Sequence, residues 1–271
     1  MKTVEQARPY FEIANLEIPK ILECLPKGLR VLDVGCGSGV HGAELKRIHH
    51  HSVTGVDIST ASIEKAGRRL DAAYVADVTK PREYPFAAGE RFDVLLFSDI
   101  LEHLTNPPEV LARHLFLLKP GGHTIVSLPN IAIWNVRFQL LFGKFRYQET
   151  GTLDKTHLRF FTWPTTREMF ETVGLELRKR RTTPGIVRPL VPLVKRLYTK
   201  AGAIQDEVDS SSIMDSGPYR FYCRFLYPIE SLVCRLWPGL LAFQYVSLCQ
   251  PLGAAEPAEA LERVDEYAVS H

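Results

Sequence analysis

Residues 31–39, which read Val-Leu-Asp-Val-Gly-Cys-Gly-Ser-Gly, constrain the fold more than any other stretch. The apolar residues at the start predict a short buried strand. Gly35, Gly37 and Gly39 then follow at every second position, where the missing Cβ permits a tight turn and a close approach of a ligand to the backbone. Helical spacing of apolar residues begins at residues 40–48. A glycine turn before a helix N-terminus favours a carboxylate-bearing or nucleotide-like ligand.

The same turn also meets the dinucleotide spacing G-x-G-x-x-G over residues 37–42. That match starts two residues after the predicted strand end. If the pattern is counted from Gly35, which follows the strand directly, its third glycine would fall on Val40, which is not a glycine. Asp33 lies two residues before Gly35, where a carboxylate would repel a pyrophosphate but could accept hydrogen bonds from an ammonium group or a water.

Two further acids follow predicted strands. Residues 53–57 end in Asp57, which is placed to accept hydrogen bonds from both hydroxyls of a ribose. Residues 74–78 contain Asp77, which could accept from an adenine amine. A single aspartate at such a place is more often a solvated turn residue or a helix cap. Three acids at three consecutive strand ends are not explained in that way.

With these residues in this order, the chain resembles the class I S-adenosyl-methionine-dependent methyltransferases. Asp33 and the three glycines match the glycine motif of that family, Asp57 its ribose-binding acid and Asp77 its adenine-side acid. The resemblance continues through a fourth strand at 92–97, a Leu-Lys-Pro-Gly-Gly turn at 118–122 and a fifth strand at 124–128.

The resemblance implies a Rossmann-like, doubly wound α/β fold. Its seven-stranded sheet would have an antiparallel last strand and helices on both faces. It implies S-adenosyl-methionine as the cofactor. The residues expected to bind it are Asp33, Gly35, Gly37, Gly39, Asp57, Ile58, Asp77, Val78 and Ser98.

Two later segments carry the candidate chemistry. Residues 98–104 follow the fourth strand, and a helix there would put Asp99 and His103 on one face. Residues 151–162 read Gly-Thr-Leu-Asp-Lys-Thr-His-Leu-Arg-Phe-Phe-Thr and are similar to a subgroup of small-molecule and glycan methyltransferases. We expect His157 to be a general base oriented by Asp154, with His103 as the second candidate.

Other interpretations of these segments remain open. His103 is as well explained as a helix cap or a packed side chain. Asp154 and Arg159 could form an ion pair that anchors the loop. Tyr10, Trp134 and Arg159 are expected to contact the acceptor, although Tyr10 is better explained as a packed aromatic residue and Trp134 could equally be core.

No metal site is predicted. The five cysteines are scattered without a C-x-x-C pair, which argues against zinc and favours a reducing compartment. The histidines at 49–51 are adjacent and therefore point in different directions, so a solvated loop is expected. The first residues lack the apolar run of a signal peptide, and a cytoplasmic location is expected.

The expected organisation is a helical lid at 1–30, a cofactor-binding core at 31–183, a helical insertion at 184–240, a final strand at 241–253 and a disordered tail at 254–271. The insertion combines apolar and basic residues. It is interpreted as a lid or a dimer interface, with peripheral contact to an anionic membrane as an alternative. The net charge of +2 gives no indication of nucleic-acid binding, and a homo-oligomer is compatible with the sequence.

The function expected from these features is O-methylation of a hydroxyl on a sugar, a glycan or another small molecule. A nicotinamide-dependent oxidoreductase is the alternative enzyme, and a non-catalytic, membrane-associated protein that binds S-adenosyl-methionine or S-adenosyl-homocysteine is the alternative of another class. Asn106-Pro107-Pro108 is interpreted as a helix start, which argues against a DNA adenine or glutamine methyltransferase.

Overall fold

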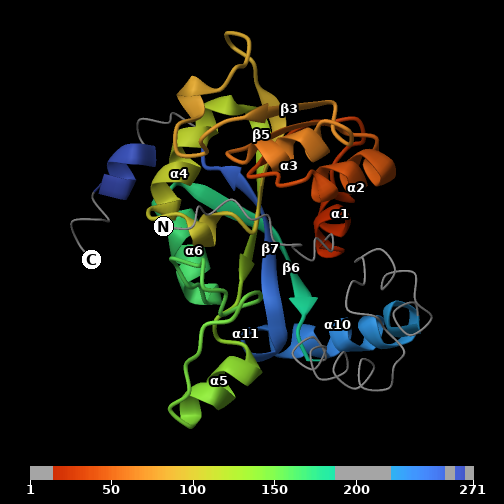
Figure 1. Cartoon of the computed structure of the whole chain (residues 1–271), viewed down its shortest axis with the longest axis vertical. Coiled ribbons are helices and arrows are strands. Elements are labelled where there is room, and N and C mark those ends of the chain that lie inside the picture. The colour runs from red at the N-terminus through yellow and green to blue at the C-terminus, as the bar shows by residue number, and fades with distance from the viewer. Residues whose placement is uncertain (1–14, 187–220, 254–259, 266–271) are drawn as a thin grey trace.

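The computed structural model describes residues 15–186, 221–253 and 260–265 of the 271-residue chain. Within these residues, seven strands form a sheet of order β3-β2-β1-β4-β5-β7-β6 (Figure 1). Neighbouring strands among β1 to β5 pair in parallel, whereas β7 is antiparallel to both β5 and β6. The strands are β1 Arg30–Val34, β2 Ser52–Asp57, β3 Ala72–Val75, β4 Phe92–Ser98, β5 Leu118–Pro129, β6 Leu175–Pro184 and β7 Ala242–Pro251. The predicted fold class is confirmed.

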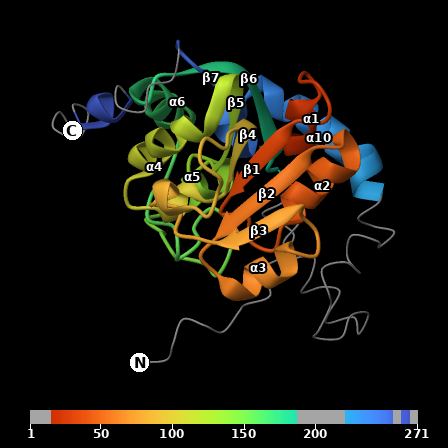
Figure 2. The same ribbon diagram turned by 90° about the horizontal axis from the view of Figure 1, so that it is seen from above.

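Helices cover both faces of this sheet, as the view from above shows (Figure 2). One face carries α1 Glu17–Leu22, α2 Val40–His49 and α3 Thr60–Ala66. The other carries α4 Pro107–His114 and α6 Trp163–Thr172, with residues 260–265 beside them. The helices α5 Trp134–Leu141, α10 Tyr227–Leu236 and α11 Pro238–Leu241 lie at one end of the long axis.

The alternation of side chains along the strands explains this two-layer burial. In β1, Leu32 and Val34 pack in the cluster that includes α4 and α6, whereas Val31 packs in the cluster that includes α1 and α2. All three side chains are fully buried. Because a parallel sheet needs cover on both faces, the strand residues are apolar on both sides rather than on one.

The predicted helix start at Asn106 is confirmed, and α3 and α6 begin in the same way at Ser59 and Thr162. Each side chain accepts a hydrogen bond from the backbone N–H three residues later, which satisfies a group that the helix itself leaves unpaired. Among the described residues, none of the helices combines the length and the apolar content that a bilayer crossing requires.

The structure differs from the expectations at three places. Residues 98–104 do not form a helix: Asp99 has a left-handed φ of 52°, and only a short 3-10 turn, η2 Leu101–His103, follows. His49 and His51 are buried and stacked on each other rather than solvated. In the predicted disordered tail, residues 260–265 are helical, and Ala260 and Val264 are buried in the core.

The outer predicted segments are described only in part. The segment 1–30 was predicted to be a lid, and its described part contains α1, which packs against α2, β6 and β7 as a layer of the core. Of the insertion at 184–240, the structure describes a short π-helical turn, η5 Tyr222–Leu226, and then α10 and α11. Residues 187–220 lie outside the described part of the chain.

Candidate active site

The glycine turn between β1 and α2 has the backbone conformation that the sequence predicts. Gly35, Gly37 and Gly39 have φ values of 72°, 52° and 79°, a region that side chains with a Cβ rarely adopt. Gly35 and Cys36 both donate their N–H to the carbonyl of Val56, at 2.8 and 3.0 Å, and so fasten the turn to the end of β2. A Cβ on Gly35 would lie 2.6 Å from Ile100. The turn is therefore folded tightly against two neighbouring strand ends.

Asp57 lies beside this turn at the end of β2. Its carboxylate accepts hydrogen bonds from the N–H groups of Gly37 and Ser59, each at 2.9 Å. Each oxygen of an ionised carboxylate has a second lone pair, so Asp57 can still accept from the hydroxyls of a ribose. Ile58, the next residue, exposes 71% of its surface, and an apolar side chain so placed suits the face of a base.

Asp77 and Val78 follow the end of β3. The Asp77 carboxylate accepts hydrogen bonds from the N–H and the hydroxyl of Thr79, and these bonds lower its pKa. Asp77 is thus ionised at neutral pH and available to an amine donor. Val78 is buried in the core, and its side chain supports this edge.

Asp33 does not face outward as the sequence suggested. The residue is 1% exposed, and its Oδ2 atom finds no hydrogen-bond partner among the described residues. Burial, reinforced by the charge of Asp57, raises its pKa to about 7. The carboxyl group lies close to Gly42 in the first turn of α2, so its direct part is to support the turn from the core.

Asp99 lies at the carboxyl end of β4 in a buried polar network. Its Oδ1 accepts from the Ser127 hydroxyl at 3.0 Å and from the Gln244 side-chain amide at 2.8 Å. Asn15 donates in turn to Gln244 at 3.1 Å. Ser98, the preceding residue and an expected cofactor contact, is buried, and its hydroxyl has no partner among the described residues. Strands β5 and β7 and the segment before α1 therefore fix Asp99 together.

Beyond Asp99, two distant segments bring three ionisable side chains together. Glu102 and His103 come from the turn after β4, and His157 comes from the loop before α6. The two imidazole rings are in edge contact, with 4.8 Å between their centroids. The Nε2 atom of His157 lies 4.0 Å from Oε1 of Glu102. The backbone joins the segments, because Leu158 and Arg159 both donate their N–H to the carbonyl of Glu102.

Backbone carbonyls determine which nitrogen carries the hydrogen on both histidines. Nδ1 of His157 lies 3.3 Å from the Thr152 carbonyl, and Nδ1 of His103 lies 3.2 Å from that of Thr156. Since a carbonyl can only accept, each Nδ1 carries the hydrogen and each Nε2 keeps its lone pair. Burial lowers the pKa of both rings, so both are neutral near pH 7.

Glu102 is the most deeply buried of the three. Burial first, and then the charge of Asp99, raise the pKa of its carboxyl group well above the ordinary value. Its Oε2 has no hydrogen-bond partner among the described residues, which is a costly arrangement for a buried polar atom. Perturbed groups of this kind are concentrated at functional sites.

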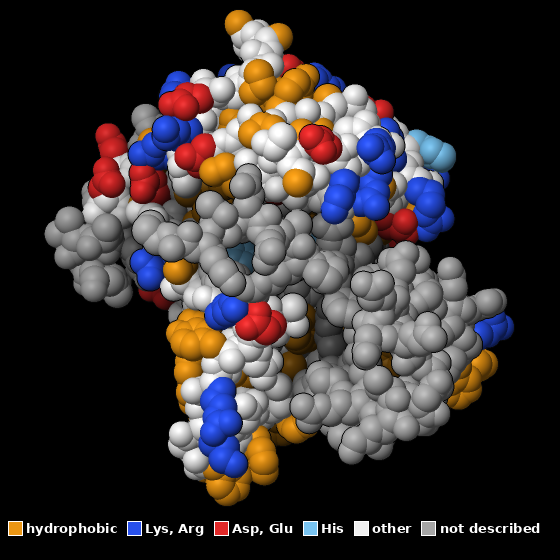
Figure 3. All heavy atoms as spheres, in the orientation of Figure 1, with side chains coloured by type: hydrophobic (Ala, Val, Ile, Leu, Met, Phe, Trp, Pro, Cys, Tyr) orange, Lys and Arg blue, Asp and Glu red, His pale blue; other side chains and the backbone are white. Residues whose placement is uncertain are grey.

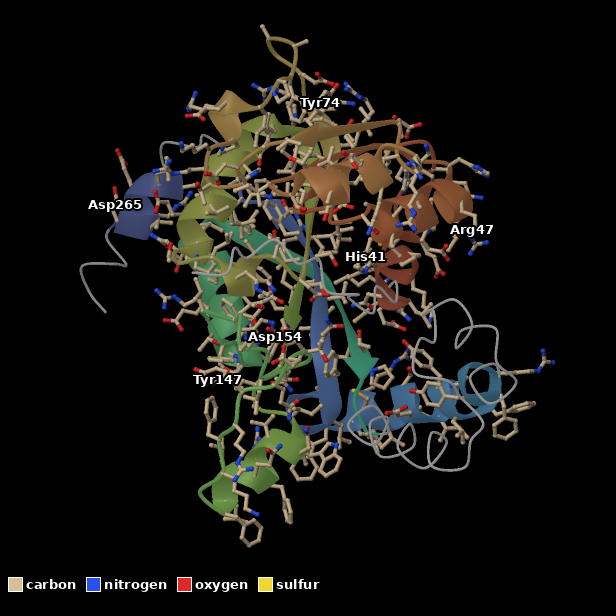
Figure 4. The ribbon with its side chains drawn as sticks, in the orientation of Figure 1. His41, Arg47, Tyr74, Tyr147, Asp154 and Asp265 are labelled. Atoms are coloured by element: carbon tan, nitrogen blue, oxygen red, sulfur yellow. The ribbon has the colours of Figure 1, made fainter. Side chains whose placement is uncertain are left out.

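The expected pairing of Asp154 with His157 is not what the structure shows. Asp154 is buried, and its Oδ1 accepts from the N–H and the hydroxyl of Thr156, at 2.8 and 2.6 Å. It therefore shapes the loop, while the Thr152 carbonyl orients His157. Figure 4 shows Asp154 on the loop between α5 and the sheet, with Tyr147 nearer to α5. The alternative ion pair of Asp154 with Arg159 is not among the ion pairs of the described residues.

The three predicted acceptor residues are placed differently from one another. Arg159 is exposed next to the histidines, with its guanidinium 3.4 Å from the Leu158 carbonyl. Trp134 is half-buried in a cluster with Ile133 and donates its indole N–H to Gly185 at 3.0 Å, so it packs as a structural residue. Tyr10 lies outside the described residues.

The cluster also offers a donor set for a cation, which the sequence did not predict. One ligand atom each from Glu102, His103 and His157 lie within 4.8 Å of one another. Two neutral imidazoles and a carboxylate suit a divalent transition metal. The carbonyls of Thr152 and Thr156 orient the rings from behind, as the partners of metal-binding histidines usually do.

Sequence reasoning missed Glu102, Gln244, Ser127 and Asn15. Glu102 stands directly before His103, and that pairing was the signal that could have led to it. Gln244 and Ser127 sit inside apolar strands, where a polar residue is unusual unless it has a buried partner. Asn15 carried no local signal.

A family model described as a methyltransferase domain matches residues 7–180, which is more than half of the chain. The ubiquinone biosynthesis O-methyltransferase of Alkalilimnicola ehrlichii is 29% identical over 157 residues, covering 53% of this chain and 60% of that protein. The enzyme of the same name from Bradyrhizobium diazoefficiens is 37% identical over 110 residues, covering 40% and 43%. The chain thus spans about half the length of the curated relatives it matches.

Solved structures share the fold at low sequence identity. A SAM-dependent methyltransferase from Archaeoglobus fulgidus superposes with a TM-score of 0.53 at 17% identity, covering 86% of this chain and 90% of that one. The [4+2]-cyclase SpnF superposes with a TM-score of 0.52 at 18% identity, covering 88% and 80%. Since one of these two proteins is named as a cyclase, the shared architecture by itself does not define a reaction.

Proposed function

Because the chain belongs to the S-adenosyl-methionine-dependent methyltransferases, we propose that it transfers the methyl group of that cofactor to a hydroxyl oxygen of a small organic acceptor. The observation that carries the proposal is the position of two neutral histidines on the same sheet edge as the glycine turn and Asp57. The carboxyl ends of parallel strands meet at this edge, where open α/β sheets bind their ligands.

The residues at the first three strand ends would hold the cofactor. The N–H groups of the glycine turn and the N-terminus of α2 suit its carboxylate, and Asp57 suits its ribose hydroxyls. Ile58 and Asp77 would contact the adenine face and amine. The cofactor supplies an electrophilic methyl group, so the protein has mainly to align the acceptor with it and to remove a proton.

His157 would take that proton. The acceptor oxygen forms a bond to the methyl carbon as the carbon–sulfur bond breaks, and the hydroxyl proton passes to Nε2 of His157. This atom keeps its lone pair because Nδ1 faces the Thr152 carbonyl. The Glu102 carboxyl group lies 4.0 Å from Nε2 and, once ionised, can stabilise the imidazolium that forms. His103 supports the ring through its edge contact.

The acceptor that we propose is an alcohol or a phenol with an apolar or ring-shaped body. The relatives are named as O-methyltransferases, which favours oxygen as the acceptor atom. Phe160 lies 6.2 Å from His157 between ring centroids and is in turn near Phe145 and Tyr147. These rings suit the face of a sugar or an aromatic ring. The proposal therefore includes both sugar hydroxyls and phenols as acceptors.

A second route at the same residues is favoured by the convergent donor atoms. A divalent cation on Glu102, His103 and His157 would polarise a hydroxyl directly, and Nε2 of His157 would then be a ligand rather than a base. The two routes exclude each other at this atom, so removal of metal distinguishes them.

Calorimetry with S-adenosyl-methionine and with NAD, followed by a screen for labelled methyl transfer into sugar and phenol acceptors, tests the function. We expect binding of S-adenosyl-methionine alone, a loss of about 10-fold or more in affinity for Asp57→Ala, and transfer to an oxygen. Binding of NAD instead, or unchanged affinity in Asp57→Ala, would reject the proposal. Cofactor binding without transfer to any acceptor would favour a non-catalytic protein.

A further inference from the structure

The helices α5, α10 and α11 lie at one end of the molecule (Figure 1), and this end exposes large apolar side chains on two separate elements. On α10, Ile229, Leu232, Val233 and Leu236 recur at helical spacing and are 62, 62, 38 and 82% exposed. The opposite side of this helix buries Tyr227 and Cys234, so α10 is apolar on both sides. Large exposed apolar areas on a folded protein mark an interaction surface.

The second element is α5 and the loop that follows it. Leu141 and Phe142 are 78 and 61% exposed, and Phe138, Phe145 and Tyr147 are also exposed. The two elements are joined, because the Arg137 guanidinium donates to the carbonyl of Gly239 in α11. We call the exposed apolar residues of α5, its following loop and α10 the apolar end.

Positive charge accompanies the apolar end. Arg137, Lys144 and Arg146 lie within residues 131–148, which contain no acid. Arg235 flanks the apolar stripe of α10, while Glu230, the acid of that helix, is buried and accepts from Ile186 and Tyr222. Figure 3 shows blue side chains among orange ones over α5 at the lower end of the molecule.

A basic cavity opens beside the same end. It has a volume of about 320 Å³ and is lined by Arg180, Arg181 and Arg235 together with Pro238, the first residue of α11. Glu17 pairs with Arg181 at 2.5 Å, while Arg180 lies over the Trp163 ring. Arg235 is thus left without a carboxylate among the lining residues, next to exposed Leu236 and Trp237.

We propose that the apolar end docks on an anionic lipid bilayer, with its apolar side chains in the interface, its cations on the lipid phosphates and one phosphate in the arginine-lined cavity. Apolar residues flanked by cations are the combination that binds such surfaces. A second copy of the chain is a poorer occupant, because a two-fold interface would bring the same cations against each other.

This docking would place the candidate active site near the lipid. A chain of ring contacts leads from Phe145 and Tyr147 through Phe160 to His157. An acceptor with a lipid tail could therefore reach His157 from the bilayer. That consequence rests on the proposed function, whereas binding to the bilayer does not.

Co-sedimentation with vesicles tests the proposal. The full chain is mixed with vesicles of phosphatidylcholine alone and of phosphatidylcholine with 30% phosphatidylglycerol. We expect at least 10-fold stronger binding to the anionic vesicles, with most of it lost in 0.5 M NaCl, since salt screens the charges. A chain carrying Leu141→Ser, Phe142→Ser, Leu232→Ser and Leu236→Ser should lose at least 10-fold in vesicle binding. A Lys144→Glu, Arg146→Glu chain should lose its preference for anionic lipid.

The matched controls are Leu252→Ser and Lys27→Glu. Leu252 is 59% exposed just past the end of β7, far along that strand from α11, and Lys27 is exposed before β1. Both should bind vesicles as the wild type does, and all variants should keep their circular dichroism and their affinity for S-adenosyl-methionine. Equal binding by the fourfold serine variant, or no binding by the wild type, overturns the proposal. The proposal is also overturned if sedimentation velocity shows that the wild type is a dimer and the fourfold serine variant a monomer, while the wild type does not bind vesicles.

Discussion

The imidazole ring of His157 contacts the edge of the His103 ring, with 4.8 Å between the centroids, although 53 residues separate the two along the chain. The contact lies at the carboxyl end of β4, beside buried Glu102. It brings the loop before α6 to the edge of the sheet where the glycine turn and Asp57 also lie. This relationship gives the proposed reaction its base.

Replacement of His157 tests that base directly. Since a positioned general base contributes about 10²- to 10⁴-fold to a rate, His157→Ala should lower kcat by that factor and leave the affinity for S-adenosyl-methionine within about 2-fold. His103→Ala should lose less, because His103 supports the ring rather than accepting the proton. The measurement is steady-state methyl transfer, with His50→Asn, at an exposed turn, as the control. A normal rate in His157→Ala together with an inactive His103→Ala would transfer the role to His103.

The buried carboxyl group of Asp33 should make the free energy of unfolding depend on pH in an unusual way. Burial raises its pKa to about 7 in the folded protein, against about 3.9 in an unfolded chain. The protonated form is therefore the one that the fold favours. Its stabilisation is fully present below the unfolded pKa and is lost as the pH rises through about 7.

Asp33→Asn keeps the neutral form at every pH. The free energy of unfolding of the variant minus that of the wild type should therefore rise by roughly 2 kcal/mol from pH 5 to pH 8. Urea denaturation without ligand measures both values. Asp71→Asn is the control of opposite sign, because the pKa of Asp71 is lowered through its bonds to Lys46 and Val53. An Asp33→Asn chain that is less stable than the wild type at pH 8 would contradict the prediction.

Substitution of two glycines with nearly the same φ distinguishes the cost of steric crowding from the cost of backbone strain. Gly35 and Gly28 have φ values of 72° and 74°, but a Cβ on Gly35 would lie 2.6 Å from Ile100, whereas nothing lies within 4 Å of one on Gly28. Gly28→Ala should cost about 1 kcal/mol from the left-handed conformation alone. Gly35→Ala should cost about 2 to 4 kcal/mol, because overpacking adds to that strain. Equal losses in chemical denaturation would show that Ile100 moves aside.

The sheet and the cofactor edge could be predicted from the sequence because both depend on local patterns. Alternating apolar residues mark each strand, and the parallel order then brings Asp57 and Asp77 to one edge whatever the details of the loops. The caps at Ser59, Asn106 and Thr162 are equally local, since each needs only a side chain three residues before an N–H.

The histidine cluster could not be predicted in the same way. It depends on how two segments pack, and no local pattern joins Glu102 to His157. The helical interpretation of residues 98–104 was wrong because Ser127 and Gln244 hold the Asp99 carboxylate, and Asp99 adopts a left-handed φ at the strand end. The sequence suggested Asp154 as the partner of His157, but the N–H and the hydroxyl of Thr156 donate to Oδ1 of Asp154 instead.

Removal of metal distinguishes the two proposed routes at His157. If His157 is the base, its Nε2 must be free to take a proton, and dialysis against EDTA should leave methyl transfer within about 2-fold of the untreated rate, since the route draws on no cation. Loss of activity with restoration by Mn²⁺ would instead assign Glu102, His103 and His157 as ligands. Calorimetry with Mn²⁺ on the wild type and on Glu102→Gln provides a reading independent of turnover, because the amide of the variant offers a metal neither the charge nor the basicity of a carboxylate. If the wild type shows a heat of Mn²⁺ binding and Glu102→Gln does not, the ion binds in this cluster. If neither protein shows a heat of Mn²⁺ binding, His157 is free to act as the base.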